Sequence, residues 1–192
     1  MSIKRKIMFV SGVIVVIILL VVMYNMISMD DRAHLEENAL APLSYPAPAR
    51  NTLHVELVED DYAIVFYEWG ATPNLRMFGI AEMEKSLFSW ELMTAYSDYE
   101  PDRYSLEWLI ADFDAYTVMR GRINHDDVDK VVLNVDGKMY EVERFESERY
   151  KYWFYISEKE DYTNAKLQGI SATGEVIEEI AFSEATLQQG KK

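Results

Sequence analysis

The first 29 residues constrain most strongly what this chain can fold into. Three basic residues, Lys4–Lys6, precede eighteen uncharged and mainly aliphatic residues, Ile7–Tyr24. A helix rises ~1.5 Å per residue, so ~20 such residues match a hydrocarbon core ~30 Å thick. The basic flank before the run, and Asp30 and Asp31 directly after it, favour a cytoplasmic N-terminus. The sequence therefore predicts a signal-anchor transmembrane helix over 1–29, followed by an extracytoplasmic chain.

A cleaved signal peptide is the main alternative to an anchor. Its apolar region usually covers only ~7–15 residues and ends close to a small-x-small cleavage site. Here such a site, Ala39-Leu40-Ala41, lies far beyond the apolar run, and Pro42 would follow the cut directly. The chain contains no cysteine, which excludes lipid attachment to a cysteine. The pattern favours an uncleaved, single-pass protein of the cell membrane.

The chain after residue 29 is strongly acidic. It holds 16 Lys and Arg against 33 Asp and Glu, a net charge of −17. Such a surface repels nucleic-acid phosphates and anionic lipid headgroups, so nucleic acid is not expected as a partner. Without cysteines the exported part forms no disulfide, so its fold must rest on a packed core. Missing cysteines and missing Asn-x-Ser/Thr sequons together favour a bacterial envelope.

Three segments follow the predicted anchor. Residues 30–52 combine a polar, helix-favouring stretch with three prolines, which predicts a juxtamembrane helix and a proline-containing linker that lifts the domain off the membrane. Residues 53–182 consist of short β-branched and aromatic runs separated by turn residues, which is typical of strands. Residues 183–192 are interpreted as a flexible tail. The fold class is mostly β: one N-terminal transmembrane helix, then an antiparallel, sandwich-like extracytoplasmic domain.

Within that domain we expect a meander over 53–97 and an immunoglobulin-like sandwich part over 98–182. The dipeptide Asp136-Gly137 lies between two apolar runs and predicts a two-residue hairpin, because both turn positions need positive φ. The register set by this turn pairs Leu133 with Tyr140, and both side chains then lie on one face.

Two further strand predictions come from the C-terminal third. Tyr150–Ile156 (YKYWFYI) is expected to be a central strand, with Tyr150, Tyr152, Phe154 and Ile156 on one face. A second hairpin is expected around Thr173-Gly174. Tyr104–Ala111 fits a short helix or a strand, and its length and neighbours favour an extended segment.

The C-terminal half resembles one kind of known domain. Its marks are a strand containing Gly121, an acidic turn over Asp126–Asp129, a valine-rich hairpin, an aromatic strand with Trp153-Phe154 and a closing hairpin over Thr173–Ile177. This pattern resembles the extracytoplasmic β-domain of small, uncharacterised, membrane-anchored proteins of Bacillus-type bacteria. The resemblance implies an exported β-fold and carries no particular activity.

The most suggestive local chemistry lies between Tyr96 and Tyr116, where carboxylates alternate with aromatic rings. Sugar-binding clefts combine these groups, and a glycosidase needs two carboxylates ~5–10 Å apart across one bond. The candidate binding residues are Asp98, Glu100, Asp102, Tyr104 and Trp108. The same alternation is also typical of a half-buried strand with its loop, which is the competing interpretation.

Other motifs indicate no catalytic or metal site. The acidic run Asn124–Asp129 departs from an EF-hand, because Val128 takes the fifth position and no glycine follows it. The three histidines lack zinc-site spacing, no serine sits in a G-x-S-x-G elbow, and the glycines do not form a phosphate-binding loop. The sequence predicts no catalytic residue, metal or cofactor.

The leading hypothesis is a non-catalytic extracytoplasmic interaction module that binds a protein or an envelope component such as the cell wall. One alternative is a protein that binds or hydrolyses wall polysaccharide through residues 96–116. A second is a sensor, which would need a partner in the membrane because only six residues precede the apolar run.

Overall fold

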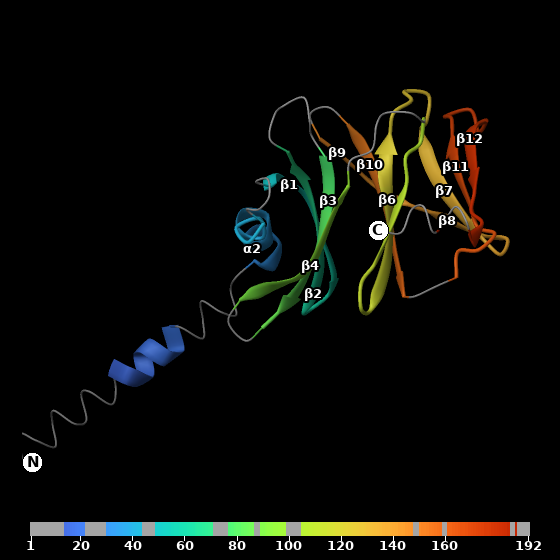
Figure 1. Cartoon of the computed structure of the whole chain (residues 1–192). Helices are drawn as coiled ribbons and strands as arrows, with labels where there is room; N and C mark the ends of the chain where they lie inside the picture. The colour runs from blue at the N-terminus through green and yellow to red at the C-terminus, as the bar shows by residue number, and fades with distance from the viewer. Residues whose placement is uncertain are drawn as a thin grey trace, which may run out of the picture.

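The structure of this 192-residue chain is a computed structural model (Figure 1). It describes residues 14–21, 30–43, 49–70, 77–86, 89–98, 105–147, 150–158, 161–184 and 187. These residues form twelve strands and little helix, so the mostly β, antiparallel fold class is confirmed.

Three four-stranded antiparallel sheets account for all twelve strands of the described residues. Sheet A has the order β1-β2-β3-β4 and consists of Ala49–Glu59, Tyr62–Trp69, Met77–Lys85 and Trp90–Asp98. Sheet B has the order β5-β6-β10-β9 and consists of Leu109–Asp112, Tyr116–Ile123, Lys151–Glu158 and Glu143–Glu146. Sheet C has the order β12-β11-β7-β8 and consists of Val176–Ala181, Lys166–Ile170, Lys130–Val135 and Lys138–Glu141.

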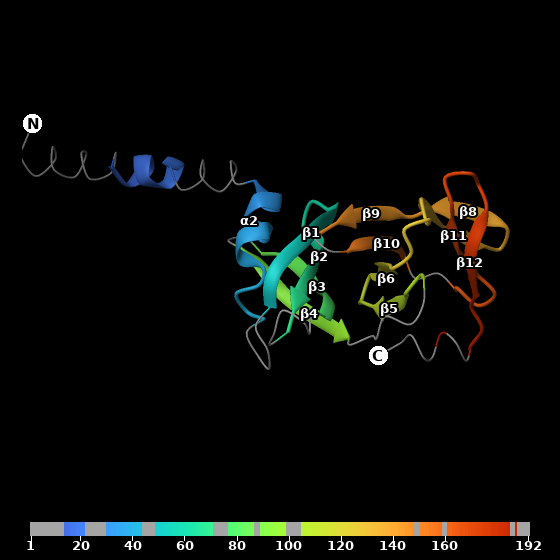
Figure 2. The same ribbon diagram turned by 90° about the horizontal axis from the view of Figure 1, so that it is seen from above.

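The sheets stack in layers with helix α2 (Asp31–Asn38) on the outer face of sheet A (Figures 1 and 2). One core lies between α2 and sheet A, a second between sheets A and B, and a third between sheets B and C. Sheet B is therefore covered on both faces.

Strand β2 is apolar along almost its whole length because it too is buried on both sides. Ala63 and Val65 face the α2 core, whereas Ile64 and Phe66 face sheet B. Strand β10 follows the same rule, since Tyr152 and Phe154 face sheet A and Trp153 faces sheet C. The face assignment expected for this strand is confirmed.

The two predicted hairpins are present with the predicted turns. Asp136 and Gly137 have φ values of 52° and 84°, and Leu133 pairs with Tyr140 across β7 and β8. Gly174 has a φ of 87° in the turn between β11 and β12. Both turns use the positive φ that short β-hairpins require.

Sheets B and C exchange strands along the chain, with crossings between β6 and β7, β8 and β9, and β10 and β11. Their strand orders are those of strands A-B-E-D and G-F-C-C′ in immunoglobulin-type sandwiches. Sheet A, by contrast, is a meander of four consecutive strands. It covers the outer face of sheet B.

Helix α2 differs from its sequence-based interpretation as an extension of the anchor. Leu35 is fully buried and Ala39 is 2% exposed, both against sheet A. The Asp31 carboxylate accepts hydrogen bonds from Lys85 Nζ (2.6 Å) and Trp90 Nε1 (3.1 Å). The helix is thus a layer of the domain, and β1 begins at Ala49 rather than near residue 53.

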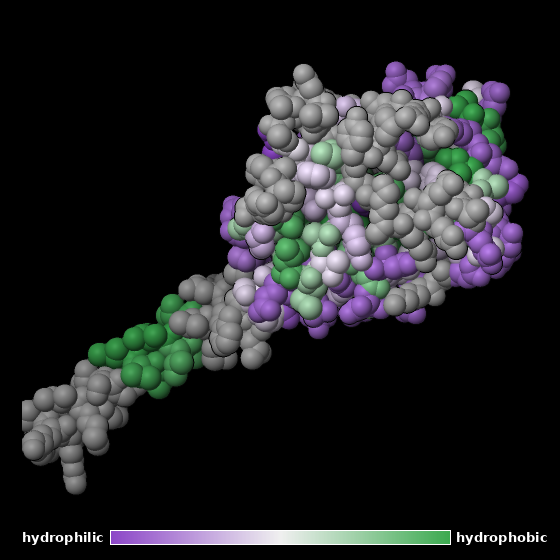
Figure 3. Space-filling model, in the orientation of Figure 1, coloured by the Kyte–Doolittle hydropathy of each residue, from purple (hydrophilic) through white to green (hydrophobic). Residues whose placement is uncertain are grey.

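Most of the predicted anchor lies outside the described residues, but 14–21 are helical. Their eight apolar side chains are 51–60% exposed, and Figure 3 shows them as an apolar stretch apart from the β-domain. Within the described part of the chain, no helix has both the length and the apolar character needed to cross a membrane. Of the expected tail, Ser183, Glu184 and Leu187 are described, and Leu187 packs against the core between sheets B and C.

Candidate functional site

Of the five sequence-predicted binding residues, the structure describes Asp98 and Trp108, so the predicted site stays a prediction. Glu100, Asp102 and Tyr104 lie outside the described residues. Asp98 is the last residue of β4 in sheet A, where it pairs with Phe78. Trp108 is half-buried before β5 and packs edge-on against Phe182, with ring centroids 4.7 Å apart. Trp108 therefore supports the core between sheets B and C.

Glu107, a carboxylate of the same stretch between Tyr96 and Tyr116, forms a buried ion pair with Arg122. Glu107 is 4% exposed and accepts hydrogen bonds from Arg122 Nε (2.7 Å) and Nη2 (3.1 Å). Asn124 Nδ2 donates a third hydrogen bond, of 2.9 Å, to Glu107 Oε1. Such a fork holds both charged groups in one geometry. The backbone carbonyl of Glu107 also accepts a bond of 3.0 Å from Trp153 Nε1.

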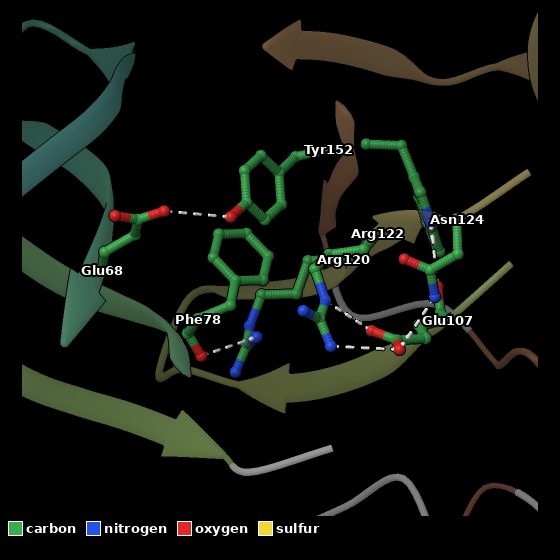
Figure 4. A network of polar contacts seen from close by, with 8 residues as sticks. Glu68, Phe78, Glu107, Arg120, Arg122, Asn124 and Tyr152 are labelled. Atoms are coloured by element: carbon green, nitrogen blue, oxygen red, sulfur yellow. Dashed lines mark hydrogen bonds and ion pairs between the residues drawn. The ribbon is translucent and has the colours of Figure 1, made fainter. Parts of the chain in front are cut away.

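This pair belongs to a buried polar network between sheets A and B (Figure 4). Strand alternation on β6 directs Arg120 to the same side as Arg122, and Arg120 is 1% exposed. Arg120 Nη1 donates to the Phe78 carbonyl (3.3 Å), and its guanidinium lies 4.9 Å from the centre of the Phe78 ring. Tyr152 donates to Glu68 Oε1 (3.4 Å). This network thus contains two buried arginines and two buried glutamates.

The network suits a structural role better than a chemical one. Burial, together with the nearby charge of Glu68, raises the pKa of Tyr152 and keeps its hydroxyl protonated. Buried charges are tolerated only when they are paired and hydrogen-bonded. The network therefore favours the one position of sheet A on sheet B in which its groups are paired. The sequence contains a signal for this network. Arg120 and Arg122 lie two positions apart in the mainly apolar run TVMRGRI, so in a strand both side chains share one face and would need buried partners there.

Several hollows mark the surface of the described residues. One, of about 930 Å³, lies between α2, β1 and the end of β2, with Glu36, Arg50 and Glu68 in its wall. A second, of about 640 Å³, lies between the turn at Asp126–Asp129 and the β11–β12 turn. Within the described residues no group of His, Cys, Asp or Glu side chains has the arrangement of a metal site.

A third hollow, of about 340 Å³, is a groove along one edge of sheet B, here called the β10 groove. Strand β9 pairs with β10 only over Lys151–Phe154, whereas β6 pairs with β10 along its whole length. The second half of β10, Tyr155–Glu158, therefore forms the floor of the groove. Leu57 and Val58 of β1 also line the groove, as do Glu141 and Glu143 at the β8–β9 crossing.

The β10 groove has a negative electrostatic character. Its charged lining residues in the described structure are all glutamates: Glu56, Glu141, Glu143 and Glu158. Tyr116, at one end of the groove, donates a hydrogen bond to Glu59. That bond, with burial and the charges of Glu59 and Glu158, raises the pKa of Tyr116 to about 12. The groove thus combines an open strand edge, apolar walls and carboxylates.

These features define a mostly β protein of three stacked antiparallel sheets, with a polar internal network and an acidic groove at a sheet edge. No protein-family model, curated protein or solved structure matches the chain. The resemblance to extracytoplasmic β-domains of Bacillus-type bacteria stays a prediction.

Proposed function

We propose that this protein is a membrane-anchored interaction module whose β-domain binds another protein or an envelope component outside the membrane. The observation that carries the anchoring is the helical segment 14–21, whose eight apolar side chains are 51–60% exposed. Exposed apolar area costs about 25 cal/mol per Å² in water, so a run of this kind favours lipid around it. The basic residues before it support a cytoplasmic N-terminus.

The binding role is supported by what the described surface offers. Its hollows contain carboxylates, and the β10 groove also has an open sheet edge, which are features of surfaces that contact other macromolecules. The alternative of a polysaccharide site over 96–116 has less support, because Glu107 and Trp108 are engaged by Arg122 and Phe182. We further infer that sheets B and C form an immunoglobulin-like sandwich, from their strand order.

Topology is tested with single cysteines, since the chain has none of its own. Thr173 is exposed in the β11–β12 turn, so Thr173→Cys is expected to react with a membrane-impermeant maleimide on intact cells. Ser2→Cys is the matched control and is expected to react only after permeabilisation. Labelling of Ser2→Cys on intact cells with protection of Thr173→Cys would overturn the topology.

Binding is tested by crosslinking in intact cells, with a photoreactive residue at exposed positions of the β-domain. A specific partner is expected in adducts from the β-domain, with no adduct from the same residue placed before the apolar run. Adducts no different from those of an unrelated anchored domain would contradict the binding role.

A further inference from the structure

We propose that the β10 groove binds an extended, basic peptide segment of a partner protein. The segment adds as a strand to sheet B, next to β10 and beyond Glu143, the first residue of β9. The proposal rests on the proposed function in that it names the class of partner. It goes further in assigning the surface, the backbone groups and the charge that recognise it.

Backbone alternation decides which groups of β10 face the groove. Ser147 N donates to the Tyr150 carbonyl (2.9 Å), which closes the β9–β10 hairpin and directs the Tyr150 backbone toward β9. Hydrogen-bonding residues alternate along an antiparallel strand, so Tyr152 and Phe154 are directed the same way. The next two in this series are Ile156 and Glu158.

The pairing on this side of β10 ends before those two residues. The last pair of the β9–β10 ladder is Glu143 with Phe154. The next residue toward the start of the chain, Val142, bonds instead to Val131 of sheet C. The chain has crossed to the other sheet, and within the described residues no strand pairs with Ile156 and Glu158 from the groove side.

The vacant position has the dimensions of a strand. The open edge Tyr155–Glu158 is about 13 Å long at ~3.3 Å per residue, and an added strand lies ~4.8 Å away, where β9 would have continued. Leu57 and Val58 form an apolar wall toward sheet A beside Ile156. Peptides that add to a sheet edge gain affinity from the backbone bonds and specificity from such side-chain pockets.

Charge complementarity identifies the occupant. The four glutamates Glu56, Glu141, Glu143 and Glu158 line the groove, and no Lys or Arg appears among its described lining residues. Glu143 pairs with Phe154, and Glu158 shares the face of Ile156 on β10, so both carboxylates lie on the sheet A side of the groove. An added strand with basic residues at alternate positions would direct them to that side, near the carboxylates. A second copy of this chain is disfavoured as the occupant, because its part after residue 29 carries a net charge of −17.

The test measures binding of a fluorescent, end-capped peptide, Lys-Val-Lys-Val-Lys-Val, to the full-length protein in detergent micelles. The peptide is expected to bind and to slow hydrogen exchange of the Ile156 and Glu158 amides. The same peptide N-methylated at every residue keeps its charge but loses its donors, and is expected to bind at least about tenfold more weakly. Equal binding of the two peptides would reduce the interaction to charge attraction and overturn the proposal.

A pair of matched variants locates the site. Glu141, Glu143 and Glu158 are exposed, so replacing all three with Gln is expected to leave the fold intact and to weaken the peptide roughly tenfold. The control replaces three exposed glutamates elsewhere, Glu37, Glu91 and Glu175, with Gln and changes the net charge equally. It is expected to weaken binding less than about twofold. Equal effects in the two variants, or none in the groove variant, would overturn the site.

The N-methylated peptide needs no protein variant, so the proposal stays testable if the groove variant is unstable. The outcomes also separate this proposal from the proposed function. A protein that is labelled outside the cell and crosslinks a partner, yet ignores the basic peptide, keeps its function and loses the β10 groove as the site.

Discussion

At the scale of single residues, Gly121 lies where the structure leaves no room for a side chain. A Cβ atom there would lie 1.8 Å from the Glu107 carbonyl oxygen and 2.7 Å from Trp153 Nε1. The carbonyl belongs to the backbone and also accepts the Trp153 hydrogen bond, so neither group can yield cheaply. We expect Gly121→Ala to lower the free energy of unfolding by about 3 kcal/mol, through overpacking and the lost bond.

The measurement is urea unfolding followed by tryptophan fluorescence. Gly169→Ala is the matched control, because its Cβ would meet a Val128 methyl group at 3.2 Å, which can shift. A Gly121→Ala protein as stable as the Gly169→Ala protein would show that strand β6 can move away from the Glu107 segment.

The Arg122–Glu107 pair gives a second prediction at this scale. Replacing one partner leaves the other buried and charged, so Glu107→Gln or Arg122→Met is expected to cost about 3–5 kcal/mol. Replacing both, as Glu107→Gln with Arg122→Met, is expected to cost less than the sum of the two single changes. A double-mutant cycle from thermal or urea unfolding measures the coupling, and strictly additive losses would contradict the pair.

At the scale of elements, Asp31 makes the docking of α2 dependent on pH. Burial alone would raise its pKa, but hydrogen bonds from Lys85 and Trp90 outweigh this and lower the pKa below the ordinary value of 3.8. A carboxyl with a lowered native pKa stabilises the fold above about pH 4, and the contribution disappears as pH falls through the native pKa. We therefore expect Asp31→Asn to be less stable than the original chain at neutral pH.

The difference should shrink as pH is lowered through the native pKa of Asp31. Urea unfolding of both proteins at neutral pH and at about pH 3 measures it. Glu37→Gln changes a charge on the exposed side of α2 without touching Lys85 or Trp90, and serves as the control. A stability difference between Asp31→Asn and the original chain that is the same at both pH values would contradict this account.

The elements also show what the sequence can and cannot predict. The Asp136-Gly137 hairpin and the two faces of β10 depend on turn chemistry and alternation within a few residues. The hairpin was predicted with the observed register, and β10 with the observed faces. The docking of α2 on sheet A depends on a contact between Asp31 and Lys85, which are 54 residues apart in the sequence. The local sequence pattern does not contain that contact, so it predicted a juxtamembrane helix in a spacer.

The surroundings of Trp108 and the β10 groove could not be predicted from the sequence for the same reason. The alternation of carboxylates and aromatic rings around Trp108 suggested an exposed binding surface. In the structure, Trp108 instead packs against Phe182, which comes from the far end of the chain. The β10 groove exists because β9 pairs with only the first half of β10, and because β1 of sheet A lies beside the unpaired second half. Strand lengths and sheet stacking are tertiary properties, and no window of the sequence contains them.

At the scale of the whole molecule, the outer face of sheet B is built for sheet A rather than for water. Val118, Tyr152 and Phe154 are each at most 2% exposed there, in a core completed by Phe66 and Ile80 of sheet A. In a two-sheet sandwich with one face of each sheet solvated, these positions would be polar. Sheets B and C consequently need sheet A, although their strand order is that of a self-contained module.

Removal of residues 1–98 tests this dependence. The remaining fragment exposes the face around Tyr152 and Phe154 together with Arg120 and Arg122, so it is expected to aggregate or to bind a dye for apolar surface, without a cooperative unfolding transition. Removal of 1–29 alone keeps α2 and all three sheets, and is expected to leave a folded, monomeric protein with cooperative unfolding. Calorimetry and size-exclusion chromatography of the two fragments decide the matter. Cooperative melting of the shorter fragment would mean that sheet A is an added layer, and that the buried network between sheets A and B stabilises their interface without being needed for the sandwich to fold.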